Sequence, residues 1–172
     1  MSRPWAPIDL APRVRAIQTN RCIGRGPYGG FNLGLHVGDD ADAVLANRQR
    51  LAETFGVVPV FANQVHGITV AEISTATDQV GDADALVVRN PCVPIGVLTA
   101  DCLPVIFSGN GVVAVAHAGW RGLAGGVLEA VLPHLGSPEG IRAWLGPCIG
   151  RDAFEVGPEV RDAFVGKSSE LA

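Results

Sequence analysis

Two short apolar runs separated by a strong turn signal dominate the hydrophobic pattern of this chain. The runs, Leu103 to Phe107 and Val112 to Ala116, are joined by Ser-Gly-Asn-Gly, which predicts a hairpin of two buried strands. A hairpin brings the residue entering one strand and the residue leaving the other to the same end of the ladder. We therefore expect Cys102, just before the first strand, to neighbour His117, just after the second.

The rest of the pattern alternates short strands with a few helices. Helices are expected from Asp39 or Asp40 to about Phe55, from Gly122 to Leu135 and from Pro158 to Val165. Further strands are expected over Arg13 to Thr19, Val57 to Ala62, Ile68 to Ile73, Asp84 to Val88, Ile95 to Thr99 and Ile141 to Leu145. Gly56 is the expected stop of the first helix, and Gly125-Gly126 weaken the second. The alternation predicts a mixed α+β layered fold.

Composition restricts the class of protein. The 172 residues are 48% hydrophobic, with a mean hydropathy of +0.28, which is typical of one globular domain. The net charge is −4 and no run of Lys or Arg stands out, so we expect no nucleic-acid partner. The proline-broken N-terminus is unlike a secretory signal and no segment is long enough to span a bilayer, so we expect a cytoplasmic protein without a membrane partner.

Three residues of metal-ligand type lie at the edges of predicted strands: His66, Cys102 and His117. If the fold brings them together, two imidazoles and a thiolate leave a fourth tetrahedral position for water or substrate, as in catalytic zinc sites. Zinc would lower the pKa of bound water toward neutrality and polarise a leaving group. Sequence spacing alone does not establish that the three residues converge.

Three other interpretations remain open for this trio. Copper also uses two histidines and a cysteine, but such sites usually add a methionine, and the only methionine here is Met1. A metal-free enzyme would use Cys102 as nucleophile, His117 as its base and Asp101 as an orienting carboxylate. The purely structural interpretation makes Cys102 a small core residue and both histidines ordinary loop residues.

Several nearby residues suit an anionic or sugar-bearing substrate. Arg121, with the free N–H groups of the helix end that follows Trp120, is a candidate for phosphate. Arg48 is a second candidate cation. Weaker candidates are Asn32 and Gln64 for hydroxyl or phosphate contacts, Trp120 for stacking and Glu155 as an acid or base. The glycine-rich loop from Gly24 to Gly30 lacks the order of a phosphate-binding P-loop, and we interpret it as a surface turn.

Long motifs spread over the chain resemble those of one bacterial family. The motifs are Asn32-Leu33-Gly34 with Val37-Gly38-Asp39, NQVHG at 63–67, TADCLPV at 99–105, AVAHAGWRG at 114–122 and LGPCIG with FEVG within 145–157. They are similar to those of the YfiH family, also called the laccase-domain or multicopper polyphenol oxidase family. The resemblance implies a single-domain, four-layer α/β/β/α sandwich over residues 1–172. It also implies a metal site, normally zinc, held by His66, Cys102 and His117.

The resemblance further implies enzymes of purine metabolism. Family members are described as phosphorolysing adenosine, inosine and methylthioadenosine to base and ribose 1-phosphate, and as deaminating adenosine. Zinc deaminases activate water for attack at C6 of adenine with the help of a glutamate, but the H-x-E motif is absent here. Alternative functions are a copper-dependent phenol oxidase, and a Cys-His hydrolase or editing factor acting on peptidoglycan precursors. Family members continue beyond the region matching Phe154 to Val165, so this chain is expected to lack their C-terminal segment.

Overall fold

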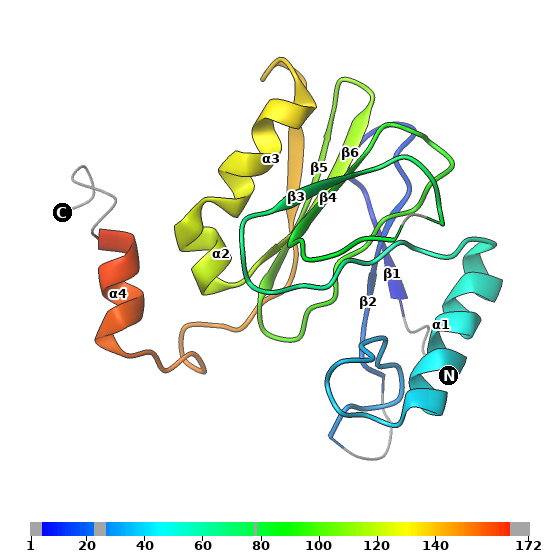
Figure 1. The fold of residues 1–172 in the computed structure, drawn as a ribbon, viewed down its shortest axis with the longest axis horizontal. Helices are drawn as coiled ribbons and strands as arrows, with labels where there is room; N and C mark the ends of the chain where they lie inside the picture. Colours follow the sequence, from blue (N-terminus) through cyan, green and yellow to red (C-terminus); the bar gives the residue numbers. More distant parts are fainter. Residues whose placement is uncertain (1–4, 23–26, 78, 166–172) are drawn as a thin grey trace.

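The computed structural model describes residues 5–22, 27–77 and 79–165 (Figure 1). Part of the glycine-rich loop, residues 24–26, and the chain end from residue 166 lie outside the described residues. In chain order the elements are β1 (Trp5–Ile8), β2 (Ala16–Thr19), α1 (Ala41–Phe55), β3 (Val70–Ile73), β4 (Ala85–Val88), β5 (Leu103–Gly109), β6 (Val112–Ala118), α2 (Trp120–Gly125), α3 (Val127–Leu135), β7 (Arg142–Leu145) and α4 (Pro158–Val165).

The centre of the fold is a five-stranded mixed sheet in the order β3-β4-β6-β5-β7. β3 and β4 run parallel, and every other neighbouring pair is antiparallel. The predicted hairpin is confirmed as β5 and β6, with Leu103 opposite Ala118 and Gly109 opposite Val112. Asn110 and Gly111 form its turn, both with positive φ (52° and 77°), as Asn-Gly favours in a tight hairpin.

α2 and α3 cover one face of this sheet (Figure 1). Val127, Val131 and Leu135 repeat every four residues, so they form one stripe of α3, and all three are fully buried. They pack on Val87 of β4 and on alanines of β6 in the main core. The opposite face carries a second cluster, in which Leu86 and Val115 pack against residues of the irregular chain on either side of β4.

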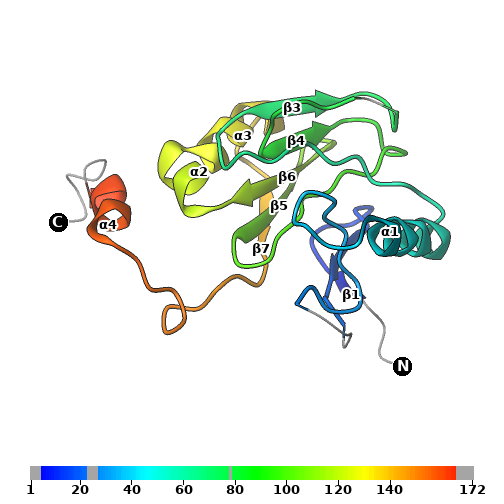
Figure 2. The ribbon, with the colours of Figure 1, turned by 60° about the horizontal axis from the view of Figure 1, so that its bottom comes forward.

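A smaller unit lies on that opposite side. β1 pairs antiparallel with β2, and α1 packs beside them, with the Trp5 and Phe55 rings 5.0 Å apart in an edge-to-face arrangement. Two views agree on the order of layers: α2 with α3, the five-stranded sheet, β1 with β2, and α1 (Figure 2). The predicted mixed fold with α/β/β/α layers is therefore confirmed, its second sheet having two strands in the described residues.

The ends of α1 follow the sequence signals. Asp40 is the N-cap and accepts a hydrogen bond from the Ala43 N–H at 2.8 Å, and Gly56 ends the helix in the left-handed conformation (φ 70°). At 15 residues α1 is the longest helix described. None of the helices in residues 5–22, 27–77 and 79–165 has the length and apolar character needed to cross a bilayer.

Some expected elements are wrong. The strands predicted over Val57 to Ala62 and Ile95 to Thr99 reduce to a single bridge between Val60 and Ile95, because Pro59 and Pro94 have no N–H to donate to a ladder. The helix predicted from Gly122 to Leu135 is two helices. β1 is an element that the sequence did not predict, because prolines interrupt its apolar pattern.

The break between α2 and α3 occurs at one glycine. Gly126 has φ 102°, outside the helical region, and its N–H closes α2 onto the carbonyls of Gly122 and Leu123. Its own carbonyl then accepts the N–H of Ala130 as α3 begins. The two helices therefore meet at a residue that serves as the C-cap of one and the N-cap of the other.

Candidate metal centre

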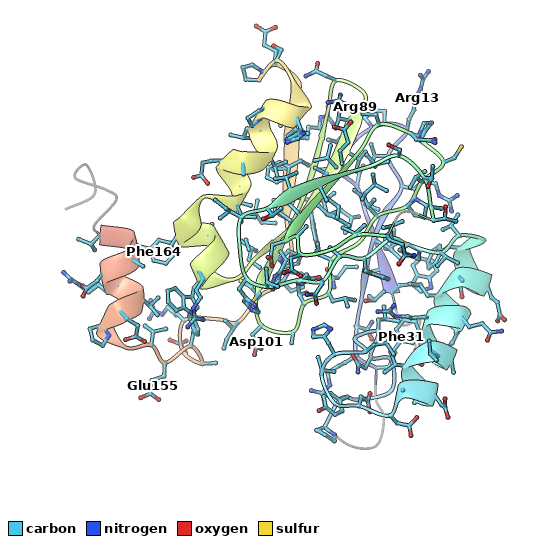
Figure 3. All side chains as sticks on the ribbon, viewed as in Figure 1. Arg13, Phe31, Arg89, Asp101, Glu155 and Phe164 are labelled. Atoms are coloured by element: carbon cyan, nitrogen blue, oxygen red, sulfur yellow. The ribbon has the colours of Figure 1, made fainter. Side chains whose placement is uncertain are left out.

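The structure brings His66, Cys102 and His117 together at one end of the five-stranded sheet. One ligand atom from each residue lies within 4.8 Å of the other two. Cys102 Sγ is 3.8 Å from His66 Nε2, and the two imidazole rings are 4.7 Å apart, nearly perpendicular to each other. Figure 3 shows Asp101, the neighbour of Cys102, at the opposite end of the sheet from Arg89. The predicted proximity of Cys102 and His117 is confirmed.

Each of the three residues is placed by a different part of the fold. His117 lies in β6, opposite Pro104 of β5, and is only 3% exposed. Cys102 directly precedes β5 and is half-buried. His66 lies in the turn before β3 and is exposed, with a positive φ of 61°. A residue other than glycine rarely adopts that conformation unless its surroundings hold it there.

The group that holds this turn is Asp84, which the sequence analysis did not single out. Its fully buried carboxylate accepts backbone N–H groups from Val65 (3.1 Å), His66 (2.9 Å) and Gly67 (2.7 Å). The same carboxylate accepts the Nδ1–H of His117 at 2.8 Å. A single anion therefore fixes both the backbone around one histidine and the ring of the other.

The contacts of Asp84 decide its charge and the tautomer of His117. Burial alone would raise the pKa of this carboxyl, but the hydrogen bonds from His117 and the three backbone amides outweigh burial and hold its pKa below the ordinary value. The residue is therefore an anion at neutral pH. Because it accepts the Nδ1 proton of His117, the Nε2 atom of that ring is left with its lone pair free toward the cluster.

Gly119 provides the space in which the cluster closes. A Cβ atom at this position would lie 2.8 Å from Cδ2 of His66 and 3.1 Å from Sγ of Cys102. The first distance is shorter than any tolerable carbon contact, so even alanine would push the ring or the sulfur away. Gly119 in the AHAGWRG motif is thus required because the side chains of His66 and Cys102 approach this position closely.

Cys102 does not have the surroundings of a free thiolate. Burial raises the pKa of its thiol, and the negative charges of Asp101 and Asp84 raise it further. Catalytic cysteines that act without a metal have the opposite environment, which lowers the pKa. Cys102 is therefore better suited to lose its proton when a cation binds than to act as a nucleophile without a metal.

The three donors fit a metal ion that takes nitrogen and sulfur ligands. Zinc bonds of about 2.0–2.3 Å in a tetrahedron separate neighbouring ligands by about 3.5 Å, close to the observed sulfur–nitrogen distance. The hydrogen bond from His117 to Asp84 is also the outer contact that metal-bound histidines usually make. The residues could therefore hold a metal through Nε2 of both histidines and Sγ of Cys102.

The structure gives Asn32 and Arg48 contacts within the fold. The Asn32 side chain bonds Asp39 (2.9 Å) and the Gly34 backbone, which shapes the loop before α1. Arg48 donates its Nε–H to the Leu33 carbonyl at 2.8 Å and stacks over the Phe61 ring. Burial lowers the pKa of its guanidinium, which remains charged at neutral pH. The hydrogen bonds of Asn32 and Arg48 go to residues outside the trio, so their substrate roles remain predictions.

Gln64 and Arg121 lie closer to the cluster in sequence, but their contacts differ. The Gln64 side chain makes two hydrogen bonds to the backbone of Leu98 (2.8 and 2.7 Å), which tie the chain before His66 to the chain before Cys102. Arg121 lies over the Trp120 ring, 4.2 Å from its centre, at the exposed start of α2. Glu155 is exposed on the segment before α4, well away from Asp101 (Figure 3). Their roles in binding stay predictions.

A wide hollow of about 1660 Å³ opens beside the cluster. It lies between the second face of the five-stranded sheet and the unit of β1 and β2, and its lining includes Gln64, Asn32 and all three residues of the trio. The hollow is larger than the few hundred cubic ångströms of most small-molecule sites, and it exposes the three donors to a common space.

Comparison with known proteins places this arrangement in a family. The sequence model of the family described as multi-copper polyphenol oxidoreductase laccase matches residues 15–172. The chain belongs to this laccase family. The resemblance to YfiH proteins that the motifs predict is also confirmed: the chain is 48% identical to the purine nucleoside phosphorylase YfiH of Escherichia coli over 144 residues, 81% of this chain and 59% of that protein.

Other relatives of the laccase family have related names. A purine nucleoside phosphorylase of Pseudomonas aeruginosa is 50% identical over 164 residues, which cover 92% of this chain and 66% of the relative. The chain therefore spans about two thirds or less of these two relatives. A solved structure of a Neisseria meningitidis protein, 41% identical, superposes with a TM-score of 0.89 over 95% of this chain and 71% of that one.

Proposed function

We propose that the laccase-family chain forms the metal-binding part of a zinc-dependent purine nucleoside phosphorylase that also deaminates adenosine. The convergence of His66, Cys102 and His117 carries this proposal, because it provides a three-donor site beside a hollow large enough for a nucleoside. Relatives support the substrate class: one is named adenosine deaminase RL5, at 40% identity over 91% of this chain, and several are named purine nucleoside phosphorylases. The proposal retains the cytoplasmic location expected from the sequence.

Zinc is the proposed metal because the donor set lacks the weak axial ligand that copper sites add. Two imidazoles and one thiolate suit zinc, and they leave room for one further ligand. Electron-transfer copper sites add a weak axial ligand, usually methionine, and the chain has a methionine only at position 1. When bound, zinc would act as a Lewis acid on the substrate or on water.

The chain's own residues would orient the reaction. Asp84 keeps Nε2 of His117 available and holds the backbone of the turn that presents His66. In phosphorolysis an oxygen of phosphate forms a bond to C1′ of ribose while the bond from C1′ to the purine nitrogen breaks. A positive charge develops on the sugar, and a phosphate held by Arg48 or Arg121 would be placed to stabilise it.

Product analysis tests the proposal. Chain loaded with zinc is incubated with adenosine or inosine, with and without phosphate, and the products are separated by chromatography. The proposal predicts ribose 1-phosphate and free base only when phosphate is present, and inosine from adenosine in either case. Cys102→Ala should abolish both reactions, whereas Cys92→Ala, which changes an exposed thiol outside the trio, should not.

The second candidate function is a copper-dependent phenol oxidase, which the name of the family favours. It predicts oxygen uptake with a phenol after loading with copper and no phosphate-dependent product from nucleosides. The third, a Cys-His hydrolase or editing factor for peptidoglycan precursors, predicts turnover that persists after all metal is removed. Either result, with no ribose 1-phosphate from zinc-loaded chain, would overturn the phosphorylase proposal.

A further inference from the structure

A second cysteine, Cys148, lies on the chain that runs beside Cys102, and both cysteines line the same hollow. The last pair of the ladder between β5 and β7 toward the metal centre is Val105 opposite Leu145. Continuing this register by three residues on each chain places Cys102 opposite Cys148.

Two hydrogen bonds join the chain before β5 to the chain after β7 on either side of the cysteines. The Gly146 N–H donates to the Pro104 carbonyl at 2.9 Å, and the Ile149 N–H donates to the Asp101 carbonyl at 2.9 Å. Both bonds join residues whose numbers fit the register of β5 and β7, but their donors are three residues apart, so the ladder is irregular between them. Cys102 and Cys148 lie between these two bonds, so the chains are fixed on either side of them.

The spacing of opposed residues suits a disulfide. Directly opposed residues of antiparallel chains have Cα atoms about 4.5–5.5 Å apart and side chains on the same face. Disulfides need Cα atoms about 4.4–6.8 Å apart. Both cysteines are free, Cys148 is exposed, and Cys102 is half-buried. Because Cys102 and Cys148 lie between two cross-chain bonds and line the same hollow, rotation of their side chains is the movement that would bring the sulfurs together.

We propose that Cys102 and Cys148 form a reversible disulfide when the protein meets hydrogen peroxide, and that this bond makes the cluster unable to hold its metal. The exposed Cys148 thiol reacts first: its sulfur attacks one peroxide oxygen, the O–O bond breaks, and sulfenic acid and water form. The Cys102 sulfur then attacks the sulfenic sulfur, the S–O bond breaks, and a second water leaves. Two thiols are oxidised by two electrons and one peroxide is reduced.

The disulfide and the metal compete for one sulfur. A disulfide sulfur is no longer a thiolate donor, so a cross-linked chain retains only His66 and His117 of the trio. The cross-link itself rests on the two flanking hydrogen bonds and on the hollow that both cysteines line. Its effect on the metal rests on the proposed function, in which Cys102 is a ligand, and the two are measured separately.

The experiment treats metal-free and zinc-loaded chain with hydrogen peroxide and digests them without reductant for mass spectrometry. Metal-free chain should yield a peptide in which Cys102 is linked to Cys148 and should lose two of its four thiols. Zinc-loaded chain should form the same link more slowly and release zinc in proportion to it, as measured with a colorimetric chelator. Dithiothreitol should restore the thiols and the capacity to bind zinc.

Two variants provide the matched comparison. Cys148→Ser should form no cross-link to Cys102 and should lose zinc under peroxide more slowly than the unmodified chain, because it lacks the sulfenic acid that Cys102 attacks. Cys92→Ser, at an exposed thiol beyond the other end of β4, should behave like the unmodified chain. Absence of the linked peptide from metal-free chain, or a link from Cys102 to another cysteine, overturns the proposal. A correct link without zinc release overturns its effect on the metal and the ligand role of Cys102.

Discussion

At the scale of single residues, the candidate metal centre depends on a buried carboxylate. Asp84 is completely buried, and the hydrogen bonds that its carboxylate accepts come from one ring nitrogen of His117 and from the backbone of the turn around His66. Burying an anion is costly unless hydrogen bonds compensate, and four of them do so here. The residue therefore organises the site without being one of its donors.

Replacing this carboxylate should weaken metal binding. In Asp84→Asn the neutral amide offers one acceptor oxygen, so it cannot satisfy all four donors, and its NH₂ group faces some of them. We expect zinc affinity to fall about 10- to 100-fold, as for other outer contacts of metal-bound histidines, in competition titrations with a chromogenic chelator. Asp82→Asn, at an exposed residue bonded to Asn63, is the matched control. Equal affinity of both variants and the original chain would show that Asp84 does not support the site.

Gly119→Ala tests the packing of the cluster. The added methyl would lie 2.8 Å from the His66 ring and 3.1 Å from the Cys102 sulfur, while the backbone at this position (φ −64°, ψ 160°) accepts alanine. We therefore expect a loss of zinc affinity of about tenfold or more with an unchanged circular dichroism spectrum. Gly81→Ala, where nothing lies within 4 Å of the new methyl, should bind zinc normally. Unaltered binding by Gly119→Ala would mean that the cluster closes differently.

The sequence predicted the three donors of this site but did not single out Asp84, the carboxylate that positions two of them. His66, Cys102 and His117 are chemically distinctive residues at strand ends, and a hairpin register brings two of them together. Asp84 resembles an ordinary acidic residue at the end of a polar connection. Its signal is its place directly before the unbroken apolar run of β4, where a carboxylate enters the core and needs donors. Which donors it finds depends on the fold, because they come from residues 17 to 33 positions away.

At the scale of elements, prediction succeeded where the local pattern was unbroken. β5 and β6 have long apolar runs and an Asn-Gly turn, and α1 has a capping residue at each end. The bridge between Val60 and Ile95 shows the reverse case: Pro59 and Pro94 beside it have no N–H to donate, and the two short runs form no further ladder pairs. Register between distant strands, such as β4 beside β6, depends on tertiary packing and is not encoded in any short segment.

The break between α2 and α3 predicts whether Gly126→Ala lowers or raises the stability of the chain. At Gly126 (φ 102°) any side chain is strained, so Gly126→Ala should destabilise the chain by about 1–2 kcal/mol in urea unfolding. In one continuous helix the same change would stabilise it by about 1 kcal/mol, because alanine favours helix over glycine. Gly150→Ala, in open space without a positive φ, should change stability little. A stabilised Gly126→Ala would contradict the two-helix description.

At the scale of the whole molecule, the five-stranded sheet is held on one face by α3. The fully buried stripe of α3 lies against the alanines of β6, where small side chains let the helix approach closely. This packing also sets the end of β6 that carries His117 against α2 and Gly119. The stability of the layer and the geometry of the cluster are therefore properties of the same interface.

Two leucines of α3 allow the effect of burial on stability to be measured apart from the effect of helix propensity. Leu135→Ala removes a fully buried side chain and should lower the free energy of unfolding by about 2–5 kcal/mol, measured by urea denaturation. Leu132→Ala changes the same residue type on the same helix where the side chain is 44% exposed, and should cost well under half as much. Similar losses for the two variants would contradict the assignment of the buried face.

The central claim is that one metal ion is held jointly by His66, Cys102 and His117, and anomalous diffraction from crystals of zinc-loaded chain tests it most directly. The account predicts one strong peak at the zinc absorption edge, at about 2.0–2.3 Å from Nε2 of both histidines and Sγ of Cys102. A peak bound elsewhere on the chain, or a peak that one of these three donors does not reach, would contradict it.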